Sequence, residues 1–86
     1  MEKADEEKIR SCILELDRSI LRSSDETVWE VIERNDQADH MIAAFGWSNV
    51  FSVMSGMMSD ISDKTVAFLK RRNRLVNAVA LLLMDS

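Results

Sequence analysis

The residue types that support catalysis or metal binding are scarce in this chain of 86 residues, which has one histidine and one cysteine. His40 follows Asp36 by four positions and Glu33 lies one turn earlier, so the three side chains share one edge of a helix. They resemble part of a metal site, but zinc sites draw on several histidine or cysteine ligands. An exposed helix edge explains the same residues. We therefore predict no metal, no cofactor and no catalytic residue.

The single cysteine, Cys12, lies in an apolar stripe rather than in a reactive motif. Ile9, Ile13, Leu16 and Ile20 share its helix face, which favours a buried structural role over a reactive thiol. One cysteine cannot form an intrachain disulfide, and this is typical of a reducing, cytoplasmic location. The acidic start of the chain, MEKADEEK, is unlike a signal peptide. No nucleotide-binding or hydrolase motif occurs.

A basic cluster, Lys70–Arg74, places four bases within five residues. Such a cluster can neutralise phosphates, and Asn73 could bind an adenine edge. Two features disfavour nucleic acid: the net charge is −4, and apolar residues follow the cluster. The alternative is a solvated face that complements an acidic first half, because residues 1–39 hold twelve acids and six bases, net −6. Arg72 falls on the apolar face, where it either snorkels to water or pairs with an acid from that half.

Met41–Met58 carries no charge and is the central element of the chain. Read as a helix, it has a stripe of small residues at every fourth position: Ala44, Ser48, Ser52 and Gly56. A second, broad stripe holds large apolar residues and extends past Met58: Trp47, Val50, Phe51, Met54, Met57, Met58 and Ile61. Methionine-rich surfaces suit adaptable recognition of other helices, but methionine also fills irregular gaps in a small core. Both interpretations stay open.

The absence of proline and tyrosine and the low glycine count favour helices throughout. Ser23 and Glu26 have capping-box spacing, Gly46 can end a helix, and Ser48 can cap the next one. An unbroken helix from Glu26 to Ser59 is the alternative. We predict helices over approximately 2–22, 26–45, 48–59 and 62–84.

Two residues of the predicted second helix each allow two interpretations. Asn35 lies on the helix's apolar face, where it either borders solvent or fixes the register of pairing with another helix. Trp29 lies beside Glu26 and Glu33, where it either anchors a partner or packs on the first helix.

Neither apolar segment suits a membrane span, which needs about 20 strongly apolar residues. Met41–Met58 contains serines, an asparagine and two glycines, and Leu75–Met84 is ten residues long and interrupted by Asn77. We therefore expect no membrane partner. Ala78–Met84 is apolar on every side, which predicts that the end of the last helix is buried, plausibly between subunits.

These observations predict an all-α fold in one domain, 1–86: a small antiparallel bundle of three to four helices completed by oligomerisation. We expect a non-enzymatic protein-interaction module, such as a regulator, inhibitor, adaptor or secretion-type chaperone, that binds another protein or itself and no small-molecule substrate. The expected partner-binding residues are Trp29, Trp47, Phe51, Met54, Met57 and Met58. The alternative, with nucleic acid as the less favoured partner, is a dimeric DNA-binding transcriptional regulator that uses Lys70, Arg71 and Arg74.

Overall fold

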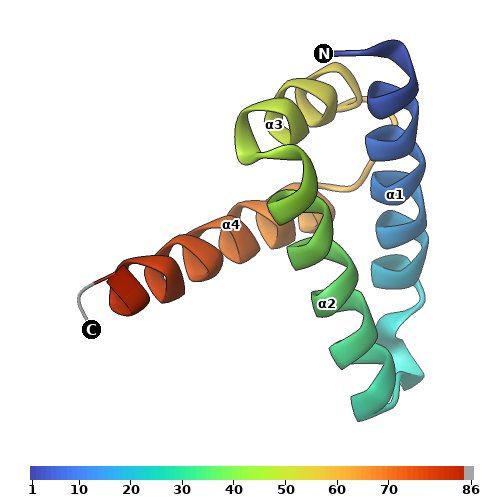
Figure 1. Cartoon of the computed structure of the whole chain (residues 1–86). Helices are drawn as coiled ribbons and strands as arrows, with labels where there is room; N and C mark the ends of the chain where they lie inside the picture. Colours follow the sequence, from blue (N-terminus) through green and yellow to red (C-terminus); the bar gives the residue numbers. More distant parts are fainter. Residues whose placement is uncertain (85–86) are drawn as a thin grey trace.

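The computed structural model describes residues 1–84, apart from the side chain of Ser23, and within these residues it contains helices and no strand (Figure 1). The elements in order are α1 (Lys3–Leu21), the 3-10 turn η1 (Ser23–Asp25), α2 (Val28–Phe45), α3 (Trp47–Gly56) and α4 (Asp63–Met84). The predicted all-α class is confirmed. The antiparallel packing and the completion by oligomerisation stay predictions.

Helix α1 buries the stripe that its sequence predicts. Ile9, Ile13 and Leu16 are fully buried, and Cys12 and Ile20 pack partly buried against the same core. Acidic residues occupy its first turn, where the partial positive charge of a helix start stabilises them. One face of α1 therefore forms one wall of the core.

Helix α2 begins two residues later than predicted, and its cap is Thr27; the side chain of Ser23, the predicted cap, lies outside the described part of the chain. The Thr27 side chain accepts a hydrogen bond from the Glu30 backbone N–H at 3.2 Å. Thr27 and Glu30 have the same capping-box spacing as the predicted pair, Ser23 and Glu26, but lie about one helical turn later in the chain. The Glu26 carboxylate, which the prediction assigned to the cap, binds the Arg34 guanidinium instead.

Gly46 separates helix α2 from helix α3, as predicted. Its backbone has φ 84° and ψ 144°, a conformation that L-residues with a side chain rarely adopt. Its N–H donates to the carbonyl of Ile42 at 2.9 Å, and its own carbonyl accepts from the N–H of Val50 at 3.1 Å. Since α3 starts directly after this residue, Ser48 lies in the first turn of α3 and is exposed, so its predicted capping role is wrong.

The two stripes predicted for the central segment have different outcomes. Most of the large stripe is core, with Val50, Met54, Met57 and Ile61 buried. The small stripe faces solvent, and a Cβ added at Gly56 would meet no atom within 4 Å. The small side chains therefore make room for no other backbone within this chain.

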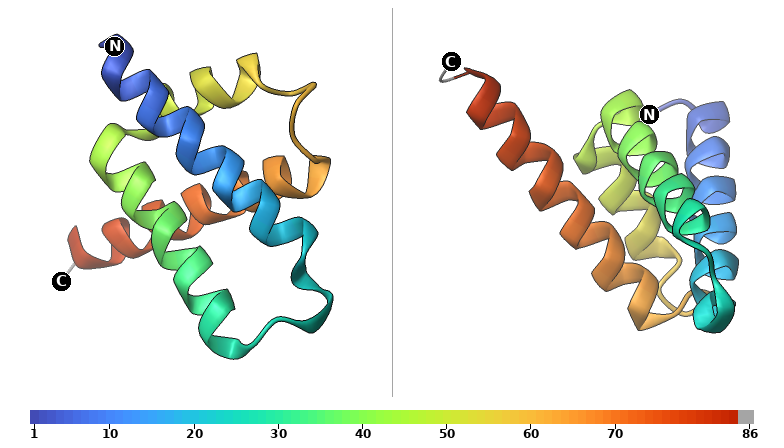
Figure 2. Two further views of the ribbon diagram at one scale, coloured as in Figure 1. Left: turned by 90° about the vertical axis from the view of Figure 1, so that its right-hand side faces the viewer. Right: turned by 90° about the horizontal axis from the view of Figure 1, so that it is seen from below.

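A buried carboxylate fixes the start of α4 to α1. Asp17 Oδ1 accepts hydrogen bonds from the Ser62 backbone N–H at 2.9 Å and from the Thr65 hydroxyl at 2.6 Å. Ser62 also caps α4, since its hydroxyl accepts from the N–H of Lys64 at 3.1 Å. From this anchor α4 packs against α1 and α2 with Phe68 and other apolar residues of its first half (Figure 2).

The second half of α4 extends away from the other three helices. In Figure 1 and in the right view of Figure 2 its end extends beyond α1, α2 and α3. Ala78–Met84 is therefore exposed in the single chain and is not buried against its own core, whereas the predicted burial between subunits stays a prediction. The reason is geometric: 22 residues of helix span roughly 33 Å, and the neighbouring helices cover only the beginning of that length.

Replacing Asp17 with alanine tests the anchor. Asp17→Ala leaves the buried Thr65 hydroxyl and the Ser62 N–H without their acceptor, so we expect the free energy of unfolding to fall by about 1–3 kcal/mol. Urea denaturation followed by circular dichroism measures this change. The double variant with Thr65→Val should lose less than the sum of the two single changes, because both partners are then removed. An unchanged denaturation midpoint in Asp17→Ala would contradict the anchoring role.

Candidate functional site

The most conspicuous surface is the distal part of α4, residues 75–84, which we call the arm. Six of its large apolar side chains are 45–81% exposed: Leu75, Val79, Leu81, Leu82, Leu83 and Met84. Exposure rises along the helix, from 0% at Leu69 through 56% at Val79 to 81% at Met84. Soluble monomers rarely expose large contiguous apolar patches, and such patches usually mark interaction sites.

The magnitude of this exposure favours association. Complete burial of a large apolar side chain contributes about 1.5–3 kcal/mol, so the six side chains of the arm represent at most about 9–18 kcal/mol. Association costs an estimated 4–15 kcal/mol in lost translational and rotational freedom. The gain from covering the arm is thus of the same order as the cost of association, and further contacts of the partner determine the affinity.

An ion pair holds the root of the arm, the turn of α4 just before Leu75, against α2. The Arg72 Nε donates to Asp39 Oδ1 at 2.8 Å, and a second nitrogen of the guanidinium bonds the other carboxylate oxygen, which gives a two-pronged contact. This hydrogen bonding, together with the charge of Asp39, raises the pKa of Arg72. Of the two interpretations left open for Arg72, the structure shows the pairing with an acid from the first half.

Beside this ion pair lies a small groove of about 210 Å³. Asp39 and Arg72 form its polar side, and Leu75, Val76 and Val79 form its apolar side. The sequence pattern did not reveal this groove, because it depends on how α4 crosses α2. The apolar run of the arm was visible in the sequence, but it predicted burial rather than exposure.

Three expected partner-binding residues lie on the surface. Trp29 is 73% exposed near the start of α2, so it does not pack on α1 as a core residue. Phe51 and Met58 are about half exposed, on α3 and just after it. These side chains remain predicted contacts for a partner.

The other expected partner-binding residues belong to the core of the chain. Met54 and Met57 are almost fully buried in it, and the half-buried Trp47 packs against it. The Trp47 ring also contacts the Phe51 ring, with centroids 5.8 Å apart. The two methionines therefore fill the core and form no exposed surface, because Met54 lies on the inward face of α3 and Met57, which directly follows α3, also points into the core.

The basic residues proposed for nucleic acid are accessible. Lys70, Arg71 and Arg74 are exposed on α4, and their spacing places them on the side away from the core residue Leu69. Arg72 is paired with Asp39 and contributes less to this face. The exposed basic surface is thus narrower than the four-residue cluster suggested.

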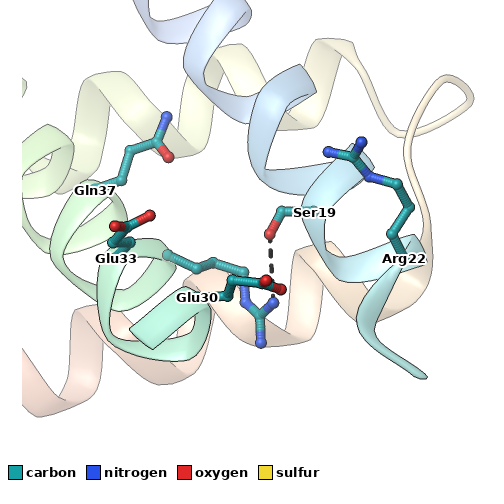
Figure 3. A pocket seen from close by; sticks show the side chains of 6 residues that line it. Ser19, Arg22, Glu30, Glu33 and Gln37 are labelled. Carbon is teal, nitrogen blue, oxygen red and sulfur yellow. Dashed lines mark hydrogen bonds between the residues drawn. The ribbon is translucent and has the colours of Figure 1, made fainter. Parts of the chain in front are cut away.

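A polar pocket of about 380 Å³ lies between α1 and α2, and Figure 3 shows its lining. The Arg34 guanidinium reaches across it and donates to Ser19 Oγ at 3.4 Å and to Glu26 Oε1 at 3.0 Å. It also lies 5.9 Å from the ring centroid of Phe68. Arg34 thus joins α1, α2 and α4, and side chains of both charges line the pocket: Ser19, Arg22, Glu30, Glu33, Arg34 and Gln37. This arrangement is typical of a structural clamp.

The residues considered for a metal or a reactive thiol do not form a site. Glu33, Asp36 and His40 are exposed, and across residues 1–84 no three histidine, cysteine or acidic side chains are placed to hold a metal ion. Burial raises the pKa of the Cys12 thiol, the charge of Glu15 raises it slightly further, and a hydrogen bond from Gln37 opposes both. A thiol that resists deprotonation is a poor nucleophile, which agrees with the predicted structural role.

In the part of the chain that the structure describes, no helix combines the length and the apolar character needed to cross a membrane. No protein-family model matches the chain, and neither a curated protein nor a solved structure shows significant similarity to it. What the arm binds must therefore be inferred from its own side chains and surroundings.

The clamp predicts a pH dependence of stability. Hydrogen bonds from Arg34 hold the pKa of Glu26 below its ordinary value of 4.5. A carboxylate with a lowered folded-state pKa stabilises the fold above its unfolded-state pKa and loses this effect as the pH falls through the folded-state pKa. We therefore expect Glu26→Gln to lower the melting temperature near pH 7 and to match the wild type once the pH is well below 4.5.

Asp25→Asn, a change at a neighbouring exposed acid, is the matched control and should show little pH-dependent difference. Thermal melts monitored by circular dichroism across this pH range provide the measurement. A Glu26→Gln deficit that persists at low pH would show that the charge of Glu26 is not its source.

Proposed function

We propose that this protein is a small non-enzymatic protein-interaction module whose main binding surface is the arm of α4. One observation carries the proposal: a helix leaves the core with its large apolar side chains exposed. Met54 and Met57 are buried, so we no longer include them in the binding surface. Trp29, Phe51 and Met58 are exposed and remain as proposed secondary contacts. A regulator, inhibitor, adaptor or secretion-type chaperone would use such a surface to hold a helix or an apolar segment of another protein or of itself.

The geometry of the arm supports recognition through a helix. The arm is a continuous part of α4, so its backbone hydrogen bonds are already formed and binding needs little ordering of the chain. The Arg72–Asp39 pair holds its root against α2. A preorganised helix with apolar side chains on every side can pack against a partner helix or insert into a partner groove.

Charged residues in the arm test this proposal. In Leu81→Glu/Leu82→Glu the changes lie outside the core, so we expect unchanged helicity and melting temperature. We expect the loss of the proteins, including an untagged copy of the chain, that co-purify with the tagged wild type. Ala67→Glu, which adds one negative charge where the double variant adds two, lies at an exposed position of the core half of α4 and is the control. Co-purification that is equal in the wild type and in both variants would overturn the proposal.

The exposure of Lys70, Arg71 and Arg74 on one side of α4 favours a second candidate, a helical DNA-binding regulator. Three accessible bases can contact phosphates, and binding would then weaken steeply with salt. The net charge of −4 opposes this candidate. The protein-interaction proposal is therefore the stronger of the two.

Retention on duplex DNA discriminates between the candidates. If the chain binds DNA, Arg71→Ala/Arg74→Ala should abolish salt-sensitive retention on a duplex-DNA column. We expect instead weak retention of the wild type at moderate salt and normal arm-dependent co-purification of the double variant. Strong retention that the double variant loses would favour the DNA-binding regulator.

A further inference from the structure

We propose that α4 binds the surface of an anionic lipid membrane, with the tip of the arm, Ala78–Met84, inserted at the interface. This inference goes beyond the proposed function, because the partner is a lipid surface. The sequence-based expectation of no membrane partner rested on the length of a span, which binding at a surface does not need. Three features of α4 support the inference: its apolar tip, its basic outer side and the position of both relative to the acidic half of the chain.

The tip, Ala78–Met84, contains no polar side chain and is exposed in the single chain. Its seven residues make about two helical turns, so apolar side chains point in every direction around the axis. A partner helix covers one side of such a tip and leaves the other sides in water, whereas a lipid surface encloses more of them. The tip spans roughly 10 Å, which reaches the boundary between headgroups and acyl chains but does not cross a hydrocarbon core of about 30 Å.

Exposed bases precede the tip on the outer side of α4, which is the side opposite the buried Leu69. Spacings of three and four residues place six exposed residues on this side: Lys70, Arg71, Arg74, Ala78, Leu81 and Leu82. When Leu81 and Leu82 reach the acyl chains, the long basic side chains therefore lie at the level of the lipid phosphates. An apolar anchor beside a basic patch is a recurrent combination in binding to anionic lipid.

The distribution of charge selects an anionic surface. The net charge of the chain is −4, but α4 holds five bases and one acid, whereas residues 1–39 carry a net charge of −6. The acidic half forms α1 and most of α2, and α4 lies along one side of these helices (Figure 2, right view). A membrane on the outer side of α4 is therefore separated from that half by a helix diameter of about 10 Å, more than the screening length of about 8 Å at physiological salt.

Asp85 limits the depth of insertion. It follows Met84 in the sequence, outside the described residues, and an acid is costly within hydrocarbon. The insertion is therefore shallow, with the leucine side chains at the acyl boundary and the helix backbone near the headgroups.

Co-sedimentation of the purified chain with lipid vesicles tests the inference. Vesicles of phosphatidylcholine and phosphatidylglycerol in equal parts are compared with vesicles of phosphatidylcholine alone. We expect the wild type to bind the anionic vesicles roughly tenfold or more tightly than the neutral ones, because each base near an anionic surface strengthens binding about fivefold.

Two double variants separate the basic and the apolar contributions. Arg71→Ala/Arg74→Ala should weaken binding to the anionic vesicles roughly tenfold or more, since it removes two of the three exposed bases of the outer side. Leu81→Gln/Leu82→Gln adds no charge and should weaken the same binding by a similar factor, since it removes apolar side chains from the interface.

Two matched controls make the same changes elsewhere in the chain. Lys3→Ala/Lys8→Ala removes two exposed bases from α1. Leu21→Gln/Val28→Gln replaces two apolar side chains whose exposure matches that of the two arm leucines. Both controls should bind the anionic vesicles like the wild type, and circular dichroism confirms that every variant is folded.

Each outcome decides the inference. A preference for anionic vesicles that is lost in both arm variants and kept in both controls supports it. A wild type that does not sediment with the anionic vesicles overturns it, and because the assay contains only the chain and lipid, the co-purification test of the proposed function is unaffected. Equal binding to neutral and anionic vesicles also overturns it. Loss in only one of the two arm variants overturns it as well, and loss in the basic variant alone favours another polyanion such as DNA.

Discussion

The hydrogen bonds that the Asp17 carboxylate accepts from the start of α4 determine the form of the molecule. They join positions that are 45 and 48 residues apart in the chain and hold the first turn of α4 against α1. Thr65 is fully buried beside this carboxylate, so its hydroxyl has no access to water as an alternative partner. Since α4 is a continuous helix, fixing its first turn also sets the direction in which its far end leaves the core. The exposed arm is a consequence of this anchor.

The size of the chain explains why the arm has no cover of its own. A chain of 86 residues provides one small core, formed here by α1, α2, α3 and the first half of α4. The clamp of Arg34 and the ion pair between Arg72 and Asp39 position these helices from the polar side. The extra length of α4 adds little to this core, and its apolar composition has a physical rationale when the arm serves association with another surface.

The sequence predicted those features that depend on neighbouring residues. The apolar stripe of α1, the break at Gly46 and the start of α4 after Ser62 followed from periodicity and capping chemistry. Two T-x-x-E or S-x-x-E boxes one turn apart compete at the start of α2, and local pattern alone could not choose Thr27.

The periodicity of the sequence could not predict the features that depend on how the helices pack together. Periodicity identified the large apolar face of α3, but whether Met54 and Met57 face inward depends on the placement of α1 and α4 around them. The exposure of the arm and the groove beside Val76 likewise depend on where the neighbouring helices end.

The two glycines differ in how well the fold tolerates their substitution. At Gly46 a side chain would strain a positive φ, so that position is closed to other residues, whereas at Gly56 open space leaves substitution sterically free. The joint between α2 and α3 can therefore vary far less during evolution than the end of α3.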